Sequence, residues 1–252
     1  MDRKTELPKA KIILDRLKTF NRKERDHLMK FALCDHPETP VISQDLRNLL
    51  SHYGQLEDSD PSSMFIGMDY HLNWLFAALA TADEPHLEHG MSWLNQWAPG
   101  LSSLVRADKN LRPIQENQED IDLLIAWYDK RKSKLHLTLL EAKLDSGWTS
   151  AQFKSKKERL TLIKLDSEQR GLTFIDWHLL LISPGNAPTR YEFALSAFEE
   201  PYHWMLEHEE KTSVPQLRHA TLPLRRRLKQ VGLVPNSKGE WWTTTTSLKP
   251  NL

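Results

Sequence analysis

Residues 121–143 constrain the fold more than any other part of the chain, because they combine two apolar runs with charges at fixed places. The first run, residues 123–127, follows Asp122, and the second, residues 135–140, leads into the triplet Glu141-Ala142-Lys143. The polar stretch between the runs has the composition of a turn. The sequence therefore predicts a β-hairpin at this position.

Charges stand at the ends of these apolar strands. Alternate residues of a strand share a face, so Leu139, Glu141 and Lys143 belong to one row. An unpaired buried charge costs several kcal/mol, so this row needs a partner, a metal or water. If the two strands pair, Asp122 brings a second carboxylate. Two carboxylates suit a hard divalent cation such as Mg²⁺, and the carbonyl of Ala142 can supply a further oxygen.

The pattern Asp122-(x)18-Glu141-Ala142-Lys143, with apolar strands around both parts and a glutamine-bearing helix after them, resembles the PD-(D/E)XK nuclease superfamily. The resemblance covers roughly residues 69–183. It implies an α/β (α+β) protein with the restriction-endonuclease-like αβββαβ core, a mixed sheet flanked by helices. It also implies that Asp122 and Glu141 bind Mg²⁺ or Mn²⁺ and that Lys143 positions or activates the attacking water. Ile121 stands where the family's name has proline, a departure that leaves this chemistry unchanged.

A helix is expected after the second strand, capped by Thr149 or Ser150 and continuing for about four turns. Gln152 and Lys156 lie on one flank of it, at i and i+4. This row resembles the Gln-x-x-x-Tyr helix of RecB-type members, with Lys156 in the place of the aromatic residue. The resemblance implies that Gln152 orients the catalytic lysine or a phosphate.

The same helix carries the expected nucleic-acid contacts. These are Lys154, Lys156, Lys157 and Arg159. Lysine and arginine supply the sequence-independent part of nucleic-acid affinity, which suits a phosphate backbone beside an acidic metal site. The alternative is that they form a solvated helix face.

An additional acid is expected from upstream of the hairpin. Asp60-Pro61 has the form of a helix start, and apolar residues from Phe65 to Leu79 recur at helical spacing. Asp69 lies at the edge of that stripe. In the superfamily a helix before the sheet often adds an acid to the metal site, which makes Asp69 the first candidate, followed by Glu119 and Glu116. The alternative for Asp69 is an acid at the rim of an amphipathic helix.

Composition sets further limits. The 252 residues include 34 basic and 34 acidic ones, so any attraction to nucleic acid must come from local basic patches. The single cysteine excludes an internal disulfide and a cysteine-based zinc site. His86 and His89 have no further ligands in sequence that would complete a zinc site. No segment resembles a signal peptide or a membrane span, so we expect a soluble cytoplasmic protein without a membrane partner.

The chain divides by pattern into three parts. Residues 1–58 are expected to form an N-terminal helical layer, with helices within residues 9–34 broken near Asn21 and a further helix after Ser43. Residues 59–212 are expected to hold the core, ending in a strand and a helix. The strand is expected at residues 172–182 and the helix at 191–208. Residues 213–252 are a basic, β-prone extension that can either grip a nucleic-acid strand or pack on the domain.

The resulting hypothesis is a metal-dependent nuclease that hydrolyses phosphodiester bonds in DNA or RNA, with DNA favoured and a homodimer compatible with the fold. No phosphate-binding loop or dinucleotide fingerprint is present in the sequence. The alternative is a catalytically inactive module on the same fold that binds nucleic acid or protein, with Glu141 and Lys143 as a structural ion pair.

Overall fold

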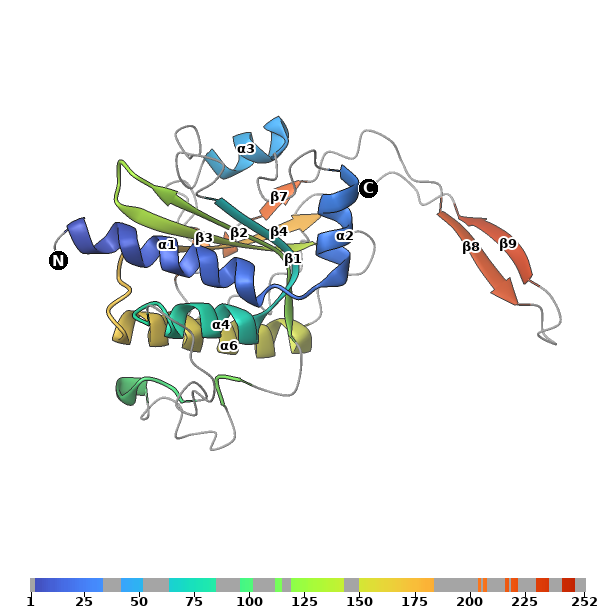
Figure 1. The fold of residues 1–252 in the computed structure, drawn as a ribbon. Helices are drawn as coiled ribbons and strands as arrows, with labels where there is room; N and C mark the ends of the chain where they lie inside the picture. Colours follow the sequence, from blue (N-terminus) through green and yellow to red (C-terminus); the bar gives the residue numbers. More distant parts are fainter. Residues whose placement is uncertain are drawn as a thin grey trace.

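The centre of the molecule is a mixed β-sheet with helices on both faces (Figure 1). The computed structural model describes residues 3–33, 42–51, 64–84, 96–101, 112–114, 119–142, 150–183, 204, 206–207, 216–217, 219–221, 230–235 and 242–247.

Four strands form the main part of the sheet, and a short fifth strand extends it. They are β1 (Met64–His71), β2 (Asp120–Asp129), β3 (Lys134–Ala142), β4 (Ile175–Ser183) and β7 (His219–Thr221), in the spatial order β1-β2-β3-β4-β7. β2 is antiparallel to β1, and β3 is antiparallel to β2. β4 is parallel to β3, and β7 is parallel to β4. The parallel step from β3 to β4 is connected through a helix, as parallel neighbours require.

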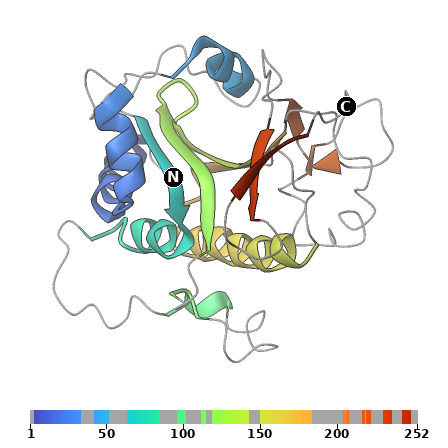
Figure 2. The same ribbon diagram turned by 90° about the vertical axis from the view of Figure 1, so that its right-hand side faces the viewer.

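The helices divide between the two faces of the sheet. They are α1 (Arg3–Phe20), α2 (Glu24–Leu33), α3 (Gln44–Ser51), α4 (Leu72–Ala80), α6 (Ser150–Gln169) and the short η3 (Pro99–Leu101). Apolar side chains of α1, α4 and α6 share one core with the sheet, and α3 packs into a second core on the opposite face. Figure 2 shows α4 and α6 side by side below the sheet and α3 above it.

The predicted hairpin is confirmed. β2 ends at Asp129 and β3 begins at Lys134. Asp129 Oδ1 accepts hydrogen bonds from the backbone N–H groups of Arg131 (2.8 Å) and Lys132 (3.0 Å), and Ser133 adopts a positive φ of 53°. An aspartate that bonds to the backbone two and three residues later stabilises a tight turn. The register of the strands is therefore fixed by local chemistry.

The helix expected from residue 61 to residue 79 is wrong in its first half. Met64–His71 form β1, and α4 begins only at Leu72, after His71 adopts an extended conformation (φ −65°, ψ 135°). The physical reason is that β1 is buried on both faces. Met64 belongs to one core and Phe65 to the other, so apolar residues do not alternate with polar ones as in a half-buried strand.

Three further predicted features of the secondary structure are present. α1 and α2 are separated at Asn21, α3 follows Ser43, and the strand expected at 172–182 is β4. α1 contributes to the main core, and β7 joins the main sheet from within residues 213–252. The helix expected at 191–208 does not reach its predicted end, because Leu206–Glu207 form the short strand β5, paired with β6 (Gln216–Leu217).

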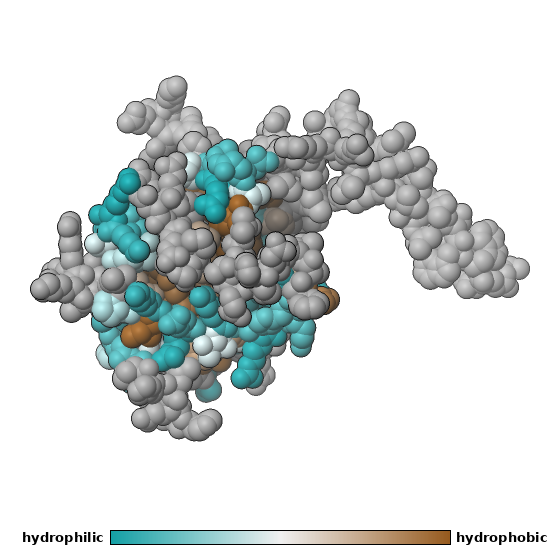
Figure 3. All heavy atoms as spheres, turned by 45° about the horizontal axis from the view of Figure 1, so that its top comes forward, coloured by the Kyte–Doolittle hydropathy of each residue, from teal (hydrophilic) through white to brown (hydrophobic). Residues whose placement is uncertain are grey.

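The remaining described strands form a separate hairpin. β8 (Gln230–Pro235) pairs with β9 (Trp242–Ser247), within the segment expected to be β-prone, and Figure 1 shows this hairpin apart from the main sheet. The basic run at 225–229 lies outside the described residues. Within the described segments no helix is both long enough and apolar enough to cross a membrane. On the face seen in Figure 3 the described atoms are mostly hydrophilic, with small separate apolar areas.

Candidate functional site

Strands β2 and β3 separate at the point where their acidic residues lie. Their pairing ends at Leu123 and Leu140, so Asp122 and Glu141 are the next residue on each strand. Beyond this point β2 pairs only with β1, and β3 only with β4. We call the residues Asp122, Glu141 and Ala142 the sheet fork. Where two paired strands separate at the end of a sheet, backbone and carboxylate oxygens become available to a ligand.

Asp122 bridges the two sides of the sheet fork. Its Oδ2 atom accepts a hydrogen bond of 2.7 Å from the backbone N–H of Ala142. The carboxylate thus replaces the backbone acceptor that β3 loses where the two strands separate. The sequence predicted a role for Ala142 through its carbonyl, and the structure adds this role for its N–H group.

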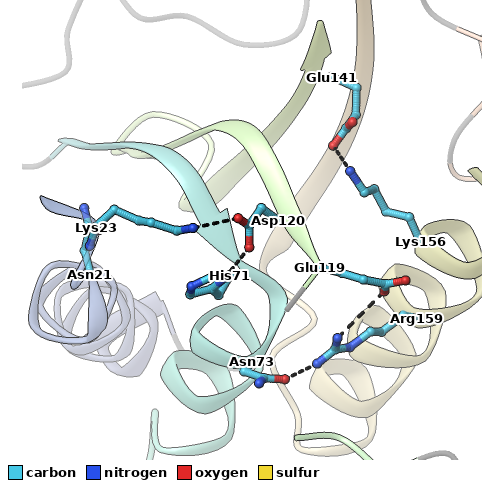
Figure 4. A network of polar contacts seen from close by, with 9 residues as sticks. All are labelled: Asn21, Lys23, His71, Asn73, Glu119, Asp120, Glu141, Lys156 and Arg159. Carbon is cyan, nitrogen blue, oxygen red and sulfur yellow. Dashed lines mark hydrogen bonds and ion pairs between the residues drawn. The ribbon is translucent and has the colours of Figure 1, made fainter. Parts of the chain in front are cut away.

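Glu141 ends the buried row of β3. Leu137 and Leu139 are buried in the main core, and Glu141, two residues further along, is only 5% exposed. Its Oε1 atom lies 2.5 Å from Nζ of Lys156, which donates the hydrogen bond from α6 (Figure 4). The prediction that Glu141 continues the apolar row is confirmed. Its cationic partner among the described residues is the lysine of the following helix.

Asp69 lies on β1 and not on a helix, which corrects the expected element. Met68 pairs with Leu123 and Tyr70 with Ile121, so Asp69 occupies the position opposite Asp122. Asp69 also has a φ of 47°, in the left-handed region. Aspartate adopts this region more readily than most non-glycine residues, and residues in such conformations cluster at functional sites. The structure therefore brings the first upstream candidate next to the sheet fork.

Glu119, the second upstream candidate, belongs to a buried network around Arg159. Arg159 is 2% exposed and donates hydrogen bonds to Asn73 Oδ1 and to the carbonyl oxygen of Pro113 (3.1 Å). Its Nη1 atom lies 3.7 Å from Oε2 of Glu119, whose Oε1 accepts a hydrogen bond of 2.5 Å from Ser155. Burial lowers the pKa of Arg159, and the Glu119 carboxylate acts in the opposite direction. Figure 4 shows Arg159 with Glu119 and Asn73; Arg159 lies on the same helix as Lys156, the partner of Glu141.

The four residues of α6 expected to contact nucleic acid differ in their exposure. Lys157 and Arg159 are buried, and Arg159 holds α6 to Asn73 and Glu119, so neither side chain faces solvent. Lys156 is partly exposed and bonded to Glu141. The side chains of Gln152 and Lys154, together with Lys143, Glu116, His86 and His89, lie outside the described residues.

A second polar contact near the sheet fork was not predicted. His71 Nδ1 is hydrogen-bonded to Asp120 Oδ1, and Asp120 Oδ2 accepts a hydrogen bond of 2.7 Å from Lys23. The ring of His71 packs edge-on against Trp74. These contacts tie the segment between α1 and α2 to the end of β1. The sequence signal for these contacts is the acidic pair Glu119-Asp120 just before the first apolar strand.

A buried histidine lies on the sheet face opposite α6. The ring of His136 stacks on Trp127, and its Nδ1 is 3.3 Å from Nε2 of His178. Asp129 and Asp176 lie 3.8 and 3.9 Å from its two nitrogens. Burial lowers the pKa of His136, which outweighs the opposing effect of the two carboxylates.

This histidine gives a pH-dependent stability. Below the unfolded pKa of about 6.5 the unfolded chain binds a proton that folded His136 binds less readily, so the free energy of unfolding should fall as the pH falls. The contribution is at most about 1.4 kcal/mol per pH unit. Urea unfolding at pH 7.5, 6.5 and 5.5 should give a flatter pH dependence for His136→Phe than for wild type. Substitution of the exposed His27 by Gln serves as the control, and equal slopes for wild type and His136→Phe would contradict the assignment.

The donor atoms at the sheet fork suit a hard cation. Asp122 and Glu141 offer carboxylate oxygens on neighbouring strands, and Ala142 offers a carbonyl oxygen. Among the described residues, no group of three or more histidine, cysteine, aspartate or glutamate side chains is arranged to hold a metal ion. An ion at the fork would therefore take its other ligands from backbone and water, as Mg²⁺ commonly does.

Comparison with known proteins gives no match: no family model, no curated protein and no solved structure matches this chain.

Proposed function

We propose that the protein is a Mg²⁺- or Mn²⁺-dependent nuclease of the restriction-endonuclease-like fold, which hydrolyses phosphodiester bonds in DNA or RNA. The observation that carries the proposal is the position of Asp122 and Glu141, each the first residue beyond the last pair of β2 and β3. The order of elements supports it in part: β2 and β3 form an antiparallel hairpin, followed by α6 and the strand β4, which is parallel to β3. The βββαβ order that the resemblance implies differs at one point, since α4 lies between β1 and β2.

The residues of the sheet fork would bind the metal ion. Asp122, Glu141 and the carbonyl of Ala142 would hold the ion, with water completing its coordination. Asp69, at the position opposite Asp122, would become a further acidic ligand only if its carboxylate moved towards the fork. When bound, the ion would polarise the scissile phosphate and lower the pKa of a water molecule.

The residues around the sheet fork would stabilise negative charge on the phosphate and orient the reacting groups. Lys143 directly follows Ala142 and would stabilise negative charge on the phosphoryl oxygens or orient the attacking water. Gln152, in the first turn of α6, would orient that lysine or a phosphate. Lys154 and Lys156 are the remaining candidates for contact with the nucleic-acid backbone.

Lys143→Ala should slow cleavage at least about a hundredfold, because one positioned cationic group is lost from the reacting phosphate. The fold and metal binding should change little. The measurement is the cleavage rate of end-labelled single- and double-stranded DNA and RNA with Mg²⁺ or Mn²⁺, with Lys132→Ala in the exposed hairpin turn as the control. Failure of the wild-type protein to cut any of these substrates, or equal rates for both lysine variants, would contradict the proposed function.

A second function is favoured by one observation. Both carboxylates of the sheet fork already have protein partners, Asp122 the Ala142 N–H and Glu141 the Lys156 ammonium. Such satisfied carboxylates fit a catalytically inactive module that binds nucleic acid or protein on the same fold. Nucleic-acid binding that is independent of Mg²⁺ and Mn²⁺, without cleavage, would favour this alternative.

A further inference from the structure

The ammonium group of Lys156 lies where a metal ion bound to Glu141 would be expected. Its ammonium nitrogen lies 2.5 Å from Glu141 Oε1, and the Glu141 side chain is 7% exposed. Figure 4 shows Lys156 extending from α6 towards the end of β3. α6 follows β3 in the chain, and the contact between Lys156 and Glu141 places the second turn of the helix beside the end of that strand.

The effect of the contact between Lys156 and Glu141 follows from the charges of the two groups. A carboxylate buried to this degree is costly unless a cation neutralises it, and the ammonium group of Lys156 does so. A divalent ion at the sheet fork would use the same carboxylate. Two cations close to one carboxylate repel each other strongly where water is largely excluded. The ammonium and a divalent ion are therefore competitors for Glu141.

We propose that Lys156 neutralises Glu141 in the metal-free protein and is displaced when a divalent ion binds, so that Lys156 sets the metal affinity of the sheet fork. The inference rests on the proposed function, since it requires a metal site at Asp122 and Glu141. Lys156 is then a positioning and regulating residue, and not a ligand. Its contact keeps the buried carboxylate paired until the ion arrives.

The inference predicts opposite effects on the two states. Removal of the positive charge at residue 156 should make the metal-free protein less stable and its metal affinity higher. Because binding to the folded state alone raises stability, Mn²⁺ should then increase the unfolding temperature of the variant more than that of the wild-type protein. A merely structural ion pair would produce the loss of stability without the gain in affinity.

The test uses Mn²⁺ as the probe and two neutral substitutions. Lys156→Gln keeps a hydrogen-bond donor for Glu141, so it is the variant that retains the fold best, and Lys156→Met is the second. Lys164→Met is a matched control, because Lys164 is on the same helix, has the same side-chain exposure of 19% and pairs with Glu168. Calorimetric titration gives the affinity, and thermal unfolding with and without Mn²⁺ gives the linked stability.

Lys156→Gln and Lys156→Met should bind Mn²⁺ about tenfold more tightly than wild type, within the usual range for coupled sites, and Lys164→Met should bind as wild type does. If wild type binds Mn²⁺ and both Lys156 variants bind it equally or more weakly, the inference is overturned while the metal site stands. If neither wild type nor the folded variants bind Mn²⁺, the proposed function falls together with the inference.

Discussion

Arg159→Met should destabilise the protein by about 3 kcal/mol, because it removes one partner from a buried charged network. Arg159 donates to the Pro113 carbonyl and to Asn73 and pairs with Glu119. Methionine fills most of the volume but removes the donor and the positive charge that these acceptors share. Glu119 is 23% exposed, so water reaches part of its carboxylate and limits the cost. Urea unfolding measures the change in the free energy of unfolding.

Two further variants make this prediction specific. Arg22→Met removes an exposed arginine and should change the free energy of unfolding by less than about 0.5 kcal/mol. Glu119→Gln in the Arg159→Met background removes the carboxylate charge that has lost the arginine, and it should restore part of the lost free energy of unfolding. A loss for Arg159→Met no larger than for Arg22→Met would show that the network does not stabilise the fold.

The hairpin and α6 could be predicted because local sequence determines them. Two apolar runs flank a turn that the Asp129 side chain closes by accepting hydrogen bonds from the backbone N–H groups of Arg131 and Lys132, so no distant segment is needed to recognise it. The position of Glu141 followed from the alternation of residues along β3. In both cases the signal lies within a few residues of the feature that it predicts.

β1 could not be predicted in the same way, because its burial depends on layers contributed by distant parts of the chain. Phe65 packs into the core formed with α1, α4 and α6, whereas Met64 packs into the core formed with α3. A strand that is covered on both faces loses the alternating pattern, and its apolar residues also matched helical spacing. The strand is recognised only once its pairing with β2 is known.

The burial and the partners of the charged residues on α6 also depend on distant parts of the chain. Lysine and arginine in a helix are most often exposed, yet Arg159 is enclosed by residues as distant in sequence as Asn73. The requirement for a partner at Glu141 could be derived from the strand pattern. The identity of that partner, Lys156, depends on how α6 crosses the end of β3, which sequence periodicity does not specify.

The most direct test of a divalent metal site at the sheet fork is Mn²⁺ binding by isothermal titration calorimetry to wild type, Asp122→Asn and Glu141→Gln. Both substitutions keep the shape of the side chain. Asparagine at 122 can still accept the Ala142 N–H, and Lys156 is exposed enough to be hydrated when Glu141 is neutral. The fold should therefore be retained, while each variant loses a negatively charged ligand oxygen.

Wild type should bind Mn²⁺ with one site, and each substitution should weaken binding by about a hundredfold or more, since even residues that only support a metal ligand contribute about 10- to 100-fold. Asp83→Asn, an exposed acid in the turn after α4, should bind Mn²⁺ as wild type does. Unchanged Mn²⁺ affinity in both Asp122→Asn and Glu141→Gln, with the fold intact, would contradict a metal site at these two residues.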